Sequence, residues 1–222
     1  KAIQSSSEYI ACDTETTGLF PRDGYILGIS LSYREDEGVY ILTDIIDSTV
    51  ELLLQDLFTE KIVVFHNAKF DIAMLEYHFN FTFPRVEDTM LLHYLLNENP
   101  GTHGLKQLAL RHTKYGNYEK PLTDYIANYC KKNRVLKSQF SWEMIPFDIM
   151  QVYSAMDAVV TLIIFHKMKE AIAKNPKLER VYDQILIPGM LFLKDIQDIG
   201  VPFDRKRLEW SQNLMEKEIE EA

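Results

Sequence analysis

The stretch Cys12-Asp13-Thr14-Glu15-Thr16-Thr17-Gly18-Leu19 places two acidic residues at the end of an apolar segment. Residues 8–12 have the pattern of a short β-strand, and a strand points alternate side chains to one face. Asp13 and Glu15 therefore share a face, with Cα atoms roughly 6.5 Å apart. Two carboxylates at the end of a buried strand need a compensating partner, and both can reach one divalent cation. For this stretch alone, a solvated strand end before a turn at Gly18 is the alternative.

A second acidic segment, His66-Asn67-Ala68-Lys69-Phe70-Asp71, follows the apolar run 61–65. Such a run is typical of a strand buried on both faces, and the segment after it has the pattern of a helix start. Asn67 lies where a helix cap is expected, and Asp71 follows one turn later on the same face. An Asp in the first turn also simply complements the helix dipole, so this segment alone does not establish a site.

A third segment, Tyr153-Ser154-Ala155-Met156-Asp157, lies inside the long helix predicted for residues 147–174. Tyr153 and Asp157 are four residues apart and project from one helix face. That face continues through apolar residues, where a carboxylate is costly unless something coordinates it. A structural Tyr–Asp pair is the alternative for this segment alone.

The three segments together predict a metal site. They supply four carboxylates, and Lys69 is the one Lys or Arg inside the motifs. Oxygen ligands of this kind suit hard divalent cations, Mg²⁺ or Mn²⁺, and no Cys and His pattern indicates zinc. The expected ligands of such divalent cations are Asp13, Glu15, Asp71 and Asp157.

Composition limits the classes of function. The 222 residues carry a net charge of -9, so bulk attraction to a polyanion cannot be the main mode of binding. Two cysteines give no disulfide framework and suit a reducing cytosol. We find no apolar run near the 18 or so residues that cross a bilayer and expect no membrane partner. The first residue is not Met and the last lies in a helical pattern, so we expect a piece of a longer protein.

The order of elements predicts an α/β fold. Strands are expected at residues 8–12, 25–33, 38–43 and 61–65, with a short one at 83–88, and helices lie between and after them. For residues 114–142 the pattern leaves the structure open. The order predicts a mixed five-stranded sheet flanked by helices, with the first strand near the middle and a C-terminal helical extension.

The three segments, in this order and at these separations, resemble the motifs of the DEDD (DnaQ-like) 3′ to 5′ exonucleases of the RNase H-like superfamily. They are most similar to those of the proofreading domain of family A (polymerase I type) DNA polymerases, bacterial or phage. Residues 13–16, 67–71 and 153–158 match the first, second and third exonuclease motifs. Tyr153, preceded by Val152 and not by His, places the chain in the tyrosine subclass, DEDDy. The likeness begins near Glu8 and covers nearly the whole chain.

The resemblance implies a domain division and a reaction. Residues 1–175 are expected to form the exonuclease domain, and residues 176–222 the helical connection and the truncated start of the polymerase thumb. The implied reaction is two-metal hydrolysis of the 3′-terminal phosphodiester of single-stranded or frayed DNA, which releases 5′-mononucleotides. The implied partners are a single-stranded DNA 3′ end and a polymerase domain in the full-length chain. The implied location is the cytoplasm, in a bacterial nucleoid or a phage-infected host.

The resemblance also implies residue roles. Asp13, Glu15, Asp71, Tyr153 and Asp157 are expected to be catalytic, with Tyr153 orienting the attacking water without ionising. Substrate contacts are expected from three further residues, Thr14, Leu19 and Asn67. Two alternatives stay open at this stage: an RNA-directed exonuclease with the same carboxylates, and a catalytically silent nucleic-acid-binding domain that serves a structural purpose.

Overall fold

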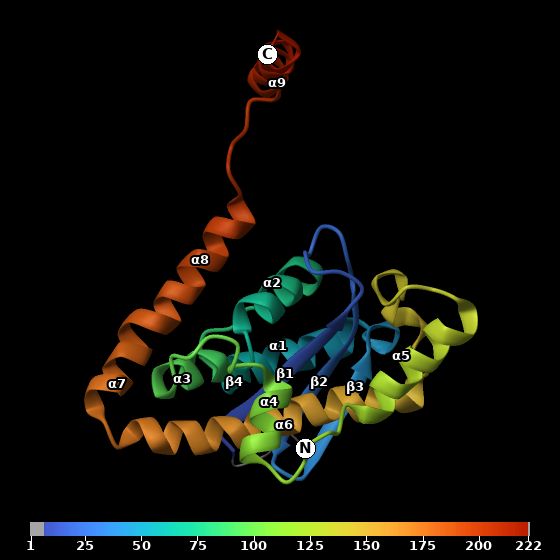
Figure 1. The fold of residues 1–222 in the computed structure, drawn as a ribbon. Coiled ribbons are helices and arrows are strands. Elements are labelled where there is room, and N and C mark those ends of the chain that lie inside the picture. The colour runs from blue at the N-terminus through green and yellow to red at the C-terminus, as the bar shows by residue number, and fades with distance from the viewer. Residues whose placement is uncertain (1–6, 222) are drawn as a thin grey trace.

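The computed structural model describes residues 7–221, and its centre is a five-stranded mixed sheet (Figure 1). The strands are β1 (Tyr9–Thr16), β2 (Ile26–Arg34), β3 (Glu37–Leu42), β4 (Ile62–Phe65) and β5 (Val86–Asp88), in the order β3-β2-β1-β4-β5. The pairs β1–β2 and β2–β3 are antiparallel, whereas β1–β4 and β4–β5 are parallel. The predicted mixed sheet with the first strand in the middle is therefore confirmed.

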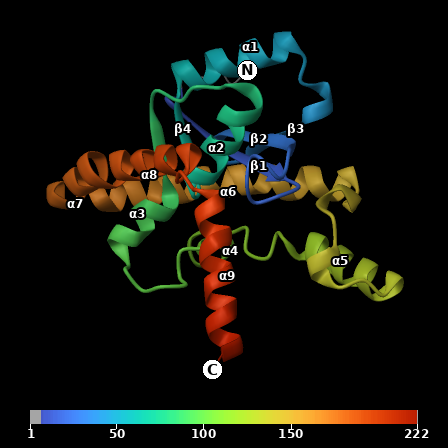
Figure 2. The same cartoon turned by 90° about the horizontal axis from the view of Figure 1, so that it is seen from above.

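Helices cover both faces of the sheet (Figure 2). Helices α1 (Ser48–Glu60) and α2 (Ala68–Phe79) pack on one face, and α3 (Thr89–Leu96), α4 (Leu105–His112) and α6 (Phe147–Ala173) pack on the other. Because both faces of the sheet are covered, alternate side chains of strand β1 pack into the cores on opposite faces. Ile10 and Cys12 belong to the core under α1 and α2, while Ala11 belongs to the core under α6. The odd-numbered residues Asp13 and Glu15 continue the α6 side, as a strand of period two dictates.

Helix α6 lies close against the sheet because β3 carries a glycine beneath it. A Cβ added at Gly38 would lie 2.5 Å from the carbonyl oxygen of Ala155, a distance that real Cβ atoms essentially never show. Ala155 lies between Tyr153 and Asp157 in the chain. The absence of a side chain at Gly38 therefore sets the height at which α6 presents the third motif to the end of β1.

Helix α6 also has the length and apolar composition of a membrane-spanning helix. Its 27 residues include an 18-residue window of mean hydropathy 1.5. The sequence expectation that no apolar run has this length is therefore wrong for α6. Within the fold, 61% of that window is buried, and its side chains form the core of the α6 side of the sheet. Burial of this kind is what a central helix of a globular domain shows.

Two acidic residues cap three of the helices. The Asp47 carboxylate accepts from the backbone N–H groups of Thr49 and Val50 at 2.9 Å and caps α1. The buried Asp88 carboxylate accepts from Met90 at the start of α3 and, at 2.8 Å, from Ala68 at the start of α2. Asp88 therefore joins the two helix starts beside the second motif.

Residues 114–142, whose structure the sequence leaves open, contain the helix α5 (Lys120–Asn133) and a short 3-10 turn at Lys137–Gln139, and a second such turn, Trp142–Met144, begins at their end. The inner face of α5 packs with Met150 of α6 in a small core that also includes Tyr153. Because α5 shares this core, its placement helps to fix the third motif.

The chain after α6 runs along the domain and then extends away from it (Figures 1 and 2). Helix α7 (Pro176–Val181) continues through a π-helical turn, Tyr182–Leu186, into α8 (Ile187–Ile199). The turn precedes Pro188, which has no N–H to donate to the carbonyl four residues earlier. Helix α9 (Arg205–Glu221) stands apart and begins at Asp204, whose carboxylate accepts from the backbone N–H of Lys206 at 3.0 Å. A domain division at residue 175 stays a prediction.

Candidate active site

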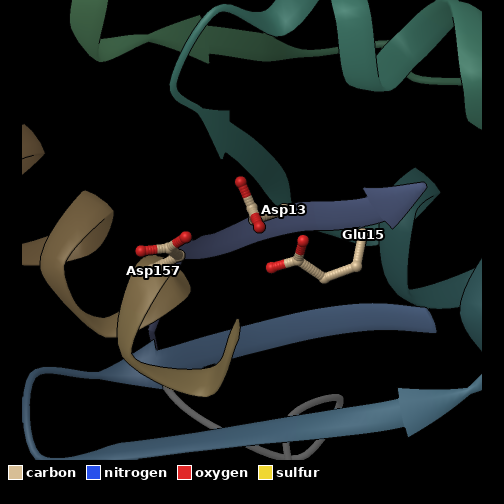
Figure 3. A group of neighbouring side chains, drawn as sticks. All are labelled: Asp13, Glu15 and Asp157. Atoms are coloured by element: carbon tan, nitrogen blue, oxygen red, sulfur yellow. The ribbon is translucent and has the colours of Figure 1, made fainter. Parts of the chain in front are cut away.

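Three carboxylates from two elements meet at the end of β1 (Figure 3). Asp13 and Glu15 come from β1 and Asp157 comes from α6, and one oxygen atom of each lies within 4.8 Å of the others. Glu15 and Asp157 are buried, with exposed fractions of 7% and 4%, and Asp13 is half-buried. The first and third motifs therefore form one acidic group, as predicted.

Burial and mutual repulsion make this group costly to ionise. Burial raises the pKa of Glu15 to about 8, and the charge of Asp157 adds to the shift. Burial also raises the pKa of Asp13 well above its ordinary value, with contributions from Asp157, Asp71 and Glu15. Crowded oxygen atoms that resist ionisation fit a hard divalent cation, whose charge offsets the repulsion. Among the described residues, Asp13, Glu15 and Asp157 are the group that could hold a metal ion.

Asp71 lies beside this group but is not one of the three. Its Oδ1 accepts from the backbone N–H of Thr14 at 2.9 Å and from the Thr14 hydroxyl at 2.7 Å. Burial raises the pKa of Asp71 to about 7, against the lowering effect of those hydrogen bonds. Because the even-numbered Thr14 points to the α2 side of the sheet, Asp71 approaches β1 from the face opposite Asp157. Direct coordination by Asp71 stays a prediction, and its Oδ1 is already engaged.

The side chain of Thr14 is bound internally. The residue is 7% exposed, and its hydroxyl donates to Asp71. The Thr14 hydroxyl therefore orients Asp71, and a contact between Thr14 and substrate stays a prediction.

Tyr153 lies against the carboxylates, as its spacing from Asp157 predicts. Burial, the charges of Asp157, Glu15 and Asp13, and a hydrogen bond to Asp157 raise the pKa of Tyr153. The phenol therefore stays protonated at neutral pH. This agrees with the predicted role of a group that orients water without ionising.

Lys106, Tyr118 and Ser154 also belong to the site, and sequence reasoning missed all three. The Lys106 ammonium forms an ion pair with Oδ1 of Asp157. The Tyr118 hydroxyl donates to the same oxygen, and the Ser154 hydroxyl donates to Glu15. Lys106 and Tyr118 are 51 and 39 residues from Asp157 in the chain, so no local spacing connects them to it.

Leu19 and Asn67, the other predicted substrate contacts, line one cleft of about 620 Å³ together with Lys69 and residues at the end of α8. Leu19 is 78% exposed in the loop after β1. Asn67 occupies the predicted N-cap position of α2 but makes no capping hydrogen bond with its side chain, and Asp88 accepts from the backbone there instead. Its left-handed backbone, with φ 71°, is a conformation that Asn tolerates well. The exposed amide of Asn67 is therefore free of the capping role.

A mixed sheet in this strand order, with an acidic group at the end of its central strand, defines a nuclease of RNase H-like fold. The family model described as 3′-5′ exonuclease, from family A DNA polymerases, matches residues 1–173. The chain therefore belongs to the 3′-5′ exonuclease domains of family A DNA polymerases, and the predicted fold class, family and enzyme class are confirmed.

Two phage relatives support the assignment. The DNA polymerase of Escherichia phage T5 is 39% identical over 221 residues, which cover 96% of this chain and 26% of that protein. The DNA polymerase of Bacillus phage SP01 is 30% identical over 213 residues, which cover 91% of this chain and 21% of that protein. The chain thus spans about a quarter or less of the length of these relatives.

Solved structures share the fold. The POL domain of Pol1 from M. smegmatis, in complex with DNA primer-template and dNTP, aligns with a TM-score of 0.72 and 16% identity, covering 98% of this chain and 33% of that chain. Brucella melitensis NrnC with bound Mg²⁺ aligns with a TM-score of 0.60 and 18% identity, covering 90% of this chain and 92% of that chain. At such identities the likeness concerns the fold alone.

Proposed function

We propose that this domain hydrolyses the 3′-terminal phosphodiester of single-stranded or frayed DNA, releases 5′-mononucleotides, and proofreads for a polymerase domain in a longer chain. The observation that carries the proposal is the meeting of Asp13, Glu15 and Asp157 at the end of β1. Because relatives with this domain are phage and bacterial DNA polymerases, the proposed partner is a polymerase domain and the proposed location is the cytoplasm of a bacterium or an infected host.

The donor set of the site suits two Mg²⁺ or Mn²⁺ ions. Asp13, Glu15 and Asp157 would hold one ion, Asp13 would also reach the second, and Asp71 would assist through water. Two ions in such a site activate the attacking water and stabilise charge on the leaving oxygen. The ions also supply positive potential at the site, which a protein of net charge -9 needs in order to bind a phosphate.

The chain's own residues orient the reactants. In the proposed reaction the Tyr153 hydroxyl, which stays protonated, holds the attacking water by a hydrogen bond. Water bonds to phosphorus on the side opposite the 3′-oxygen and loses a proton to solvent. The bond from phosphorus to the 3′-oxygen breaks, and that oxygen takes a proton. The terminal nucleotide leaves with its 5′-phosphate, and the shortened strand keeps a 3′-hydroxyl.

The cleft lined by Leu19 and Asn67 is the proposed binding site for the strand end. Leu19 offers an exposed apolar side chain to a terminal base, and the Asn67 amide offers both a donor and an acceptor. Stacking and backbone contacts of this kind do not depend on base identity. A mismatched end frays at lower cost and would enter the cleft more often, so proofreading needs no recognition of sequence.

A direct test uses a 5′-labelled DNA primer, matched or mismatched at its 3′ end, with Mg²⁺ and with EDTA. We expect stepwise shortening in Mg²⁺, faster for the mismatched end, and none in EDTA. The matched control is Glu87→Gln, which removes a buried carboxylate on β5 outside the acidic group. It should keep the activity. Preference for an RNA oligonucleotide of the same sequence would redirect the assignment to RNA, and absence of any cleavage would leave a silent binding domain.

A further inference from the structure

Lys106 brings a positive charge into the acidic group, and none of the three motifs accounts for it. The residue lies in the first turn of α4, and its ammonium pairs with Oδ1 of Asp157. The two side chains are 27% and 6% exposed. The Lys106 ammonium therefore neutralises part of the negative charge of the acidic group.

Two aromatic rings hold the ammonium in place. The Lys106 Nζ lies 4.3 Å from the ring centre of Tyr153 and 4.7 Å from that of Tyr118. It also donates a 2.9 Å hydrogen bond to the Tyr118 hydroxyl. Ring faces carry negative electrostatic potential, so both rings favour a cation between them. The position is therefore built from α4, α6 and the segment before α5, and is not a chance contact of a surface lysine.

The Asp157 carboxylate pairs with Lys106 and is also a candidate metal ligand. Oδ1 receives the ammonium of Lys106 and the hydroxyl of Tyr118. Asp157 is also one of the three carboxylates whose oxygens lie close enough to share a metal ion. Two cations that compete for one carboxylate repel each other strongly at such distances, because the effective dielectric constant near a buried site is low. A flexible lysine stem allows the ammonium to withdraw from Asp157 while it stays near the rings.

We propose that Lys106 is an internal counter-cation that competes with divalent metal for Asp157. The ammonium balances part of the acidic charge, so the site assembles on the folded domain without metal. Metal binding then displaces the ammonium from Asp157. Lys106 is thus a positioning residue that sets the metal concentration the site needs. The proposal rests on metal binding as described under the proposed function.

The test is Mn²⁺ binding by calorimetry to the whole chain and to two variants, Lys106→Met and Lys106→Arg. Methionine keeps an unbranched apolar side chain of similar length and removes the charge, so the Kd for Mn²⁺ should fall at least about tenfold. Arginine keeps the charge and can pair with the carboxylate through two N–H groups, so the Kd should stay the same or rise. The matched control is Lys169→Met, since Lys169 pairs with Glu87 and lies 5.0 Å from the ring centre of Tyr182, outside the acidic group. Its Kd should not change.

Thermal melting gives a second readout that does not depend on activity. Lys106→Met should lower Tm in EDTA, and saturating Mn²⁺ should restore it. Lys169→Met should lower Tm by the same amount in both conditions. Three results would overturn the proposed competition between Lys106 and metal for Asp157. They are a Kd for Lys106→Met that is unchanged or higher, a Kd for Lys106→Arg well below that of the wild type, and a loss of Tm in Lys106→Met that is equal with and without Mn²⁺. Failure of the wild type to bind Mn²⁺ overturns the proposed function itself.

Discussion

The Ser154 hydroxyl donates a 2.8 Å hydrogen bond to Oε1 of Glu15 and joins the middle of α6 to the end of β1. Ser154 is fully buried, and its hydrogen bond lowers the pKa of Glu15 against the larger effect of burial. The bond therefore favours the ionised carboxylate, the form that binds a cation. It also fixes which oxygen of Glu15 remains available to the acidic group.

Ser154→Ala should raise the pKa of Glu15 and move the rise of the exonuclease pH–rate profile to higher pH. A shift of about one pH unit would cut the ionised fraction, and the rate at neutral pH, about tenfold. The rate should recover at high pH. The control is Ser32→Ala, because Ser32 is equally buried but donates to backbone carbonyls of the β2–β3 hairpin. A uniform loss of rate at every pH would contradict the explanation.

The raised pKa values predict how stability depends on pH without metal. Burial raises the pKa of Glu15 from 4.5 to about 8 and that of Asp71 from 3.8 to about 7. Because the folded protein holds these protons more tightly than the unfolded chain, their stabilising effect is complete below about pH 4 and is lost as the pH rises through 7 to 8. In EDTA, Tm should therefore fall between pH 5 and 9.

A divalent cation should oppose this fall, because it binds the ionised carboxylates. The increase in Tm caused by Mn²⁺ should grow with pH over the same range, as measured by calorimetric melting. Glu15→Gln removes one of the titrating groups and should flatten the curve measured in EDTA. A wild-type Tm that is constant from pH 5 to 9 in EDTA would contradict the raised pKa values.

Asp13 and Asp157 should respond differently to the loss of charge. Asp13 forms no ion pair among the described residues and is repelled by its acidic neighbours when it is ionised, so at high pH Asp13→Asn should raise Tm in EDTA by about 2–4 °C, equivalent to about 1 kcal/mol. Asp157→Asn breaks the ion pair with Lys106 and should lower Tm. Both variants should lose exonuclease activity by roughly 1,000-fold or more. Loss of stability in both variants would argue against repulsion at Asp13.

Tyr153→Phe should slow turnover on the order of 10- to 100-fold, which is the scale of misplacing a reactant. The ring that contacts Lys106 is kept, so affinity for single-stranded DNA, measured by fluorescence anisotropy in Ca²⁺, should change little. The pH–rate profile should keep its shape because the phenol does not titrate in the accessible range. Equal turnover by the two proteins would make the hydroxyl incidental.

The sequence predicts the parts of this fold that depend on local pattern. The sequence pattern predicts helices at residues 68–79 and 89–96, because each follows a buried or extended segment and shows regular apolar spacing. Helices α2 and α3 have these bounds. The sequence pattern predicts a helix from residue 48 with Ser48 as its cap, but the cap of α1 is the preceding Asp47, since adjacent residues can both serve as caps. The sequence pattern also predicts Thr102 as the cap of the helix that follows it. The N-cap of α4 is Gly104, and Thr102 donates to a backbone carbonyl instead.

What the sequence does not reveal is contact between distant segments that lack a motif. Lys106 has the pattern of an ordinary lysine in the first turn of an amphipathic helix, and only the folded chain brings it to Asp157. Asp88 carries a detectable local signal, because an acid directly before a helix is a standard N-cap. Asp88 also accepts a hydrogen bond from Ala68 at the start of α2. That contact depends on the pairing of β4 with β5, which no local pattern predicts.

Gly38→Ala tests whether the closeness of α6 to the sheet positions the site. The added Cβ would meet the backbone carbonyl of Ala155 at 2.5 Å, so α6 or β3 must shift. Overpacking of this kind costs about 1–3 kcal/mol. The shift also moves Asp157 relative to Glu15, so the Kd for Mn²⁺ should rise along with the loss of Tm. Gly189→Ala in α8 is the control, because its Cβ would meet nothing within 4 Å, and it should leave metal binding unchanged. If Gly38→Ala lowered Tm but left the Kd for Mn²⁺ intact, the carboxylates would not depend on the packing of α6 against β3.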